Sequence, residues 1–71
     1  MEVYVFRTGV EKEDDIKKVA PHLNSLKGVY RWTFDLDDSE NILRVEAAGV
    51  SAGEIESILT RQNCFCEELP D

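Results

Sequence analysis

The two cysteines stand one residue apart near the end of the chain, in the run Cys64-Phe65-Cys66. In a β-strand alternate side chains share a face, so both thiols would lie on one face and Phe65 on the other. Thiolates are the ligands that Cu(I) and Zn(II) prefer, which makes Cys64 and Cys66 the candidate metal ligands. Two positions about 6.6 Å apart along a strand converge poorly on one ion. We therefore favour an interpretation as small buried core residues, with a soft-metal carrier as the alternative.

The remaining residues that could bind a metal or act in catalysis argue against a calcium site and against an enzyme. The acidic run 35–41 places oxygen ligands at alternate positions, as a calcium-binding loop does. Glu40, however, stands where such a loop requires glycine. His22 is the single histidine, and no nucleophile or pair of carboxylates accompanies it at a catalytic spacing. We therefore expect a protein that is not an enzyme.

Charge and composition restrict the partners of this chain. Fifteen acidic and eight basic residues give a net charge of −7 over 71 residues. Such a chain repels phosphate backbones and anionic lipid headgroups, so we expect neither nucleic acid nor a membrane as a partner. The residues after Met1 form no apolar h-region, and no apolar run is long enough to span a bilayer, so we expect neither a signal peptide nor a membrane span. The two thiols cannot cross-link distant segments, which favours reduced cysteines and a cytoplasmic location.

The periodicity of apolar residues predicts six elements in a single domain covering residues 1–71. Four segments have the alternation or the β-branched and aromatic composition of strands: residues 3–6, 29–36, 42–47 and 64–69. Residues 12–27 and 52–62 have helical spacing, and a capping box of Ser51 and Glu54 precedes the second helix. The order βαββαβ predicts an α+β, ferredoxin-like fold. Its antiparallel sheet has the order 4-1-3-2, with both helices on one face.

Along almost the whole chain these segments resemble the heavy-metal-associated (HMA) domains, the family of the copper chaperones. The run Thr8–Asp15 resembles the G-M-x-C-x-x-C loop of that family. Gly28-Val29 resembles its GV pair at the second strand, and Asp35-Leu36 resembles the DL pair that ends this strand. The resemblance implies the ferredoxin-like fold and, where the loop keeps both cysteines, a bound soft metal.

This chain departs from the family pattern in the metal loop. Val10 takes the place of the methionine, and Lys12 and Asp15 take the places of the two metal-binding cysteines. An ammonium group and a carboxylate do not replace two thiolates as ligands of a soft ion. The resemblance therefore implies a degenerate member with no bound cofactor. The alternative is that Cys64 and Cys66 form a displaced site for Cu(I) or Zn(II).

The sheet face turned away from the helices is the expected interaction surface. We expect Val3 and Val5 to face the helices, which turns the aromatic residues of the same strand outward. With the strand order 4-1-3-2 the outward set forms one apolar patch: Tyr4, Phe6, Ile42 and Phe65. A contiguous patch of this kind is typical of a contact with another protein. The sequence thus predicts a non-catalytic binding module that engages a protein partner or associates with itself.

Overall fold

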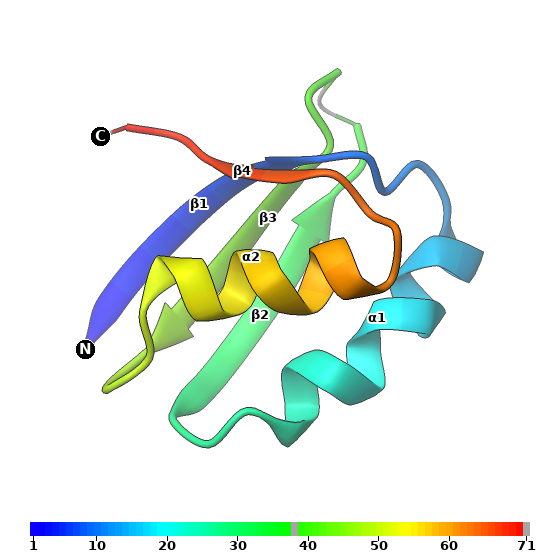
Figure 1. Ribbon diagram of the computed structural model, residues 1–71. Coiled ribbons are helices and arrows are strands. Elements are labelled where there is room, and N and C mark those ends of the chain that lie inside the picture. Colours follow the sequence, from blue (N-terminus) through cyan, green and yellow to red (C-terminus); the bar gives the residue numbers. More distant parts are fainter. Residues whose placement is uncertain (38, 71) are drawn as a thin grey trace.

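The computed structural model describes residues 1–37 and 39–70. Its elements follow one another as β1 (Glu2–Thr8), α1 (Glu13–Ser25), β2 (Val29–Asp35), β3 (Ile42–Ala47), α2 (Ala52–Arg61) and β4 (Cys66–Glu68). The four strands form one antiparallel sheet in the order β2-β3-β1-β4, and both helices lie on one side of it (Figure 1). The predicted ferredoxin-like fold and strand order are confirmed.

Both helices begin where the sequence predicts. Lys12 is the N-cap of α1, and acidic residues fill the first turn, where the positive end of the helix dipole stabilises them. Ser51 caps α2, since its Oγ accepts a hydrogen bond from the Glu54 N–H at 3.2 Å. α1 continues through the exposed Pro21. Neither helix is long and apolar enough to cross a membrane, within the residues that the structure describes.

The last strand is shorter than predicted because the end of α2 takes up its first residues. Asn63 has a φ of +62°, the left-handed conformation that commonly ends a helix. The Cys64 N–H consequently donates to the Leu59 carbonyl at 2.9 Å instead of joining the sheet. β4 therefore begins at Cys66 and not at Cys64.

The core lies between the sheet and the two helices. It contains large side chains that are fully buried: Phe6, Val19, Leu23, Leu43, Val45, Ile55 and Leu59. The apolar stripes of α1 and α2 supply Leu23, Ile55 and Leu59, as their helical spacing predicts. The helix-facing side of β3 supplies Leu43 and Val45, which were expected there.

The predicted face of β1 is wrong. Phe6 is 0% exposed and Val3 is 54% exposed, so the aromatic residues turn toward the helices and the valines turn away. The pairing with β3 explains this, because Tyr4 lies opposite Val45 and Phe6 opposite Leu43. Residues directly opposite each other in a sheet share a face, so β3 places both rings over the core.

The Tyr4 hydroxyl, a polar group at the margin of the core, has hydrogen-bond partners. Its ring packs against the core cluster, and its hydroxyl donates to the Val50 carbonyl at 2.7 Å. The same hydroxyl lies 3.1 Å from a carboxylate oxygen of Glu2. A half-buried tyrosine gains from such a partner, because an unpaired hydroxyl against an apolar surface is costly. Phe6 is therefore a core residue, Tyr4 packs half-buried against the core, and neither belongs to an outward patch.

Candidate functional site

The loop between β1 and α1 is anchored by apolar and hydrogen-bonding contacts. Val10 is fully buried, and its N–H donates to the Thr8 Oγ1 at 3.2 Å. The Thr8 hydroxyl in turn donates to the Asn41 carbonyl at 2.7 Å. Val10 thus fixes the loop to the core, while Lys12, two residues later, is exposed.

Lys12 and Asp15, the two loop positions singled out in the sequence, hold the start of α1. The Asp15 carboxylate accepts a hydrogen bond from the Glu11 N–H at 3.2 Å, and the Asp15 N–H donates to the Lys12 carbonyl at 3.0 Å. The described part of the chain has two ion pairs, one between Arg7 and Glu67 and one between Arg31 and Glu46. Neither of them involves Lys12 or Asp15. The loop therefore offers a carboxylate and an ammonium group, a donor set that does not fit a soft metal.

The cysteine segment lies beside this loop, as the strand order predicts. The Gly9 N–H donates to the Phe65 carbonyl at 2.9 Å, and Thr8 lies opposite Cys66 in the sheet. Both cysteines are half-buried free thiols. Cys66 packs against the core, and the Cys64 Sγ lies 3.7 Å from the Gln62 carbonyl oxygen.

Burial disfavours the thiolate form of both cysteines. It raises the pKa of Cys64, with a further increase from the nearby Asp15 carboxylate and an opposing effect of Lys18. It raises the pKa of Cys66 to about 12, with further contributions from Glu56 and Cys64. A soft metal would have to displace both protons. Among the described residues, no group of three or more His, Cys, Asp or Glu side chains could hold a metal ion.

We predict that Cys66 reacts slowly with thiol reagents. Relative to an ordinary thiol, a pKa of about 12 lowers the thiolate fraction at about pH 8 by more than three orders of magnitude. A more basic thiolate is also more nucleophilic, and this offsets about half of the expected loss in reaction rate, counted in orders of magnitude. Alkylation of the Cys64→Ser variant, followed by mass spectrometry, should therefore be roughly 50–100-fold slower than alkylation of free cysteine. The same variant unfolded in urea is the control, and equal rates in both states would contradict the burial of Cys66.

The open sheet face carries Val3 and Val5 in place of the predicted Tyr4 and Phe6. Phe65 is 54% exposed, and the Arg7 guanidinium carbon lies 5.8 Å from the centre of its ring. Arg7 also pairs with Glu67 and lies opposite the half-buried Ile42 in the sheet. Phe65 and Ile42 are thus embedded among charged side chains. Without Tyr4 and Phe6 they do not form the expected aromatic patch.

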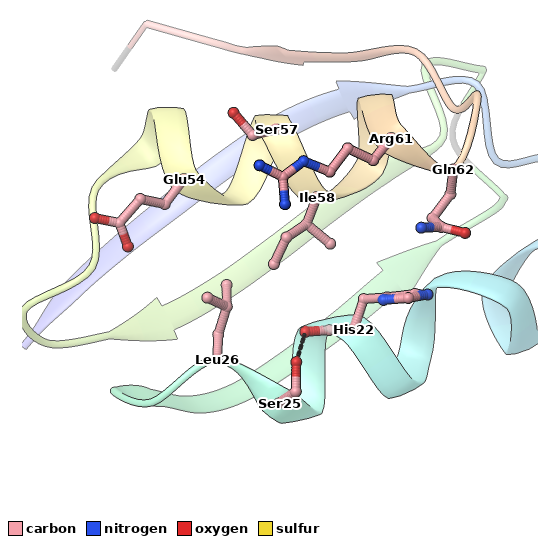
Figure 2. A pocket seen from close by; sticks show the side chains of 8 residues that line it. All are labelled: His22, Ser25, Leu26, Glu54, Ser57, Ile58, Arg61 and Gln62. Atoms are coloured by element: carbon pink, nitrogen blue, oxygen red, sulfur yellow. Dashed lines mark hydrogen bonds between the residues drawn. The ribbon is translucent and has the colours of Figure 1, made fainter.

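Sequence reasoning missed a groove between the two helices. It has a volume of about 430 Å³, and Figure 2 shows the side chains that line it: His22, Ser25, Leu26, Glu54, Ser57, Ile58, Arg61 and Gln62. Glu54 and Arg61, both on the α2 wall, give the lining opposite charges. His22, the single histidine, lines the groove from the α1 side. The sequence gives little indication of this groove, because its lining residues come from two helices far apart in the chain and share no motif.

The end of the molecule that carries the β1–α1 loop is acidic. The β2–β3 hairpin meets the loop there, since the Thr8 N–H donates to the Glu40 carbonyl at 3.2 Å. The carboxylates of this acidic end are exposed or half-buried and belong to Glu11, Glu13, Asp14, Asp15, Asp37 and Glu40. Lys12 lies among them. Lys17 and Lys18, exposed in the next turn of α1, also oppose part of this charge, and the six carboxylates leave the surface net negative.

Comparison with known proteins identifies the fold and goes no further. No family model matches the chain, and no curated protein matches it in sequence. The structure is similar to that of the yeast copper transporter domain Ccc2a, with a TM-score of 0.85 and 23% sequence identity over 100% of this chain and 99% of that chain. The Atx1–Cu(I)–Ccc2a complex contains a similar chain, with a TM-score of 0.84, 23% identity and the same coverage. The protein thus has the ferredoxin-like fold of a copper-transporter domain.

Proposed function

We propose that the protein is a non-catalytic protein-binding module, derived from a metal-carrying domain of the HMA type, that docks a basic partner surface through its acidic end. The observation that carries the proposal is the composition of the β1–α1 loop. Lys12 and Asp15 stand where the resembling family has thiolates, and carboxylates surround them. The loop is held by the buried Val10 at the end of the sheet, but an ammonium group and a carboxylate stand where that family has its soft-metal ligands.

Two further points support a protein partner. The similar domain Ccc2a has been solved in a complex with the protein Atx1, so this fold can accommodate a protein. The net charge of −7 attracts a basic surface and disfavours nucleic acid and anionic membranes. The reduced thiols favour a cytoplasmic location for this interaction.

We predict that the wild-type protein does not withdraw Cu(I) from a chromogenic chelator, whereas the Lys12→Cys/Asp15→Cys variant withdraws one equivalent. The double variant places two thiols at the loop positions that resemble the family's metal-binding cysteines. The Lys12→Ser/Asp15→Ser variant is the matched control and should behave as the wild type.

The same titration tests the second candidate function, a soft-metal carrier that uses Cys64 and Cys66. The proximity of the cysteine segment to the loop favours this candidate, and the raised pKa values of both thiols oppose it. If the wild type withdraws Cu(I) stoichiometrically and a Cys64→Ser/Cys66→Ser variant does not, the carrier function replaces our proposal.

We predict that the acidic end binds a cationic probe. Reversing two charges with Glu13→Lys and Asp14→Lys should weaken the binding of an oligolysine peptide by about fivefold, or about 1 kcal/mol, since exposed ion pairs contribute a few tenths of a kcal/mol each. The matched control is Glu2→Lys with Glu54→Lys, which makes the same charge change at the other end of the molecule. Titration calorimetry at low salt measures both. Equal losses in the two variants would show that net charge alone drives binding and that the acidic end is not a docking site.

A further inference from the structure

The two edges of the sheet differ in how they are protected. β4 is only three residues long, and the Glu56 side chain of α2 accepts a hydrogen bond from the Glu68 N–H at 2.8 Å. β2 is seven residues long. In the described part of the chain, residues 30–35 make no backbone hydrogen bond other than those of their ladder with β3. β2 therefore presents a row of backbone groups that a further strand can pair with.

The side chains of β2 have a self-complementary order. Arg31, Thr33 and Asp35 are exposed on the open face, in the sequence positive, neutral, negative. Trp32 and Phe34 occupy the helix-facing side and contact each other edge to face, with their ring centres 5.9 Å apart. When such a strand is placed antiparallel to a copy of itself and centred on Thr33, each arginine lies opposite an aspartate and each tryptophan opposite a phenylalanine.

We infer that β2 is a homodimerisation edge, at which two copies of the chain pair antiparallel about Thr33 and join their sheets into one. Arg31, which pairs with Glu46 of its own chain at 2.9 Å, then also lies opposite Asp35 of the other copy, and Trp32 lies opposite Phe34. Opposite charges and paired rings directly across two strands both stabilise a sheet. The occupant is a second copy because the charge order of this segment is complementary to itself, and closed two-fold pairing is the commonest form of association.

The charges also select this register. A shift of two residues in one direction places Thr33 opposite Arg31 and leaves Asp35 opposite Val29. A shift in the other direction places Arg31 opposite Asp37, which lies beyond the end of β2. The irregular pairing between Val29 and Arg31 limits the straight edge to residues 31–35. A segment this short gives a weak, reversible dimer, because a stable interface normally buries more residues on each side.

The test uses two variants that complement each other. Arg31→Asp and Asp35→Arg each place like charges opposite one another twice in a homodimer, so each variant should dimerise at least about tenfold more weakly than the wild type. An equimolar mixture of the two variants can form a heterodimer, in which every opposed pair again has opposite charges. The mixture should therefore dimerise about as well as the wild type does. Sedimentation equilibrium from micromolar to near-millimolar concentration measures all three samples, and circular dichroism confirms that each variant is folded.

Arg44→Asp is the matched control. Arg44 is exposed on the same face, but it lies on the interior strand β3, so this variant should dimerise as the wild type does. A second measurement is amide hydrogen exchange at residues 31–35, which should slow as the protein concentration rises. A wild type that stays monomeric at every concentration, or a variant mixture that does not regain dimers, would overturn the inference. Arg31→Asp should leave oligolysine binding intact, so failure of this inference is distinguishable from failure of the proposed function.

Discussion

Replacement of Phe6 by alanine should lower the free energy of unfolding by about 3–5 kcal/mol, the usual cost of removing a buried phenyl ring. Phe6 is 0% exposed and lies at the centre of the core, opposite Leu43 and beside the Tyr4 ring. A domain of this length has a total stability of only about 4–10 kcal/mol. The variant should therefore lose about a third or more of its stability, as measured by urea denaturation monitored by circular dichroism.

Val3→Ala is the control for this experiment. Val3 is on the same strand but 54% exposed on the open face, so its truncation should cost less than about 1 kcal/mol. The sequence-based interpretation of β1 makes the reverse prediction, with Val3 in the core and Phe6 outside. If Val3→Ala destabilises the protein more than Phe6→Ala does, the aromatic face of β1 is the open one.

The arrangement of the elements could be predicted because each carries its own signal. The helical spacing in α1 and α2 and the cap at Ser51 depend on neighbouring residues alone. The strand order then follows from the alternation of strands and helices, since few topologies connect βαββαβ without left-handed crossovers. These features come from local interactions and chain connectivity, which a single sequence contains.

The face of β1 could not be predicted from apolar character, because both of its faces are apolar. Val3 and Val5 alternate with Tyr4 and Phe6, and either pair would make an acceptable core. The register with β3 decides between them, and register is a tertiary property. One signal was available: Arg7 shares a face with the two valines, and a charged residue marks the side that faces water.

The candidate site shows the same division between local and tertiary information. The absence of thiols from the β1–α1 loop, with Lys12 and Asp15 in it, is visible in the sequence, and the structure adds that the buried Val10 anchors the loop. The sequence does not show that Asn63 extends the hydrogen bonding of α2 to Cys64. Because of that extension, the two cysteines do not alternate along one strand as the period-two pattern assumes.

Replacement of Gly28 by alanine should cost about 2–5 kcal/mol, the sum of positive-φ strain and steric overlap. Gly28 has a φ of +102°, and a Cβ there would lie 2.4 Å from the Ala48 carbonyl oxygen and 2.8 Å from a Val50 methyl group. The backbone cannot easily retreat, because the Gly28 carbonyl accepts a hydrogen bond from the Ala48 N–H at 2.9 Å. The connection from α1 into β2 thus requires a residue without a side chain.

Gly49 provides a control that separates the two causes of this loss. It also has a positive φ, +75°, but a Cβ there would meet nothing within 4 Å. Gly49→Ala should therefore cost only the conformational strain, about 1–2 kcal/mol. The difference between the two variants in urea denaturation measures the overlap of the Gly28 Cβ with Ala48 and Val50. Equal losses would mean that the segment after β3 moves aside for the new methyl group, and that positive φ alone accounts for the glycine before β2.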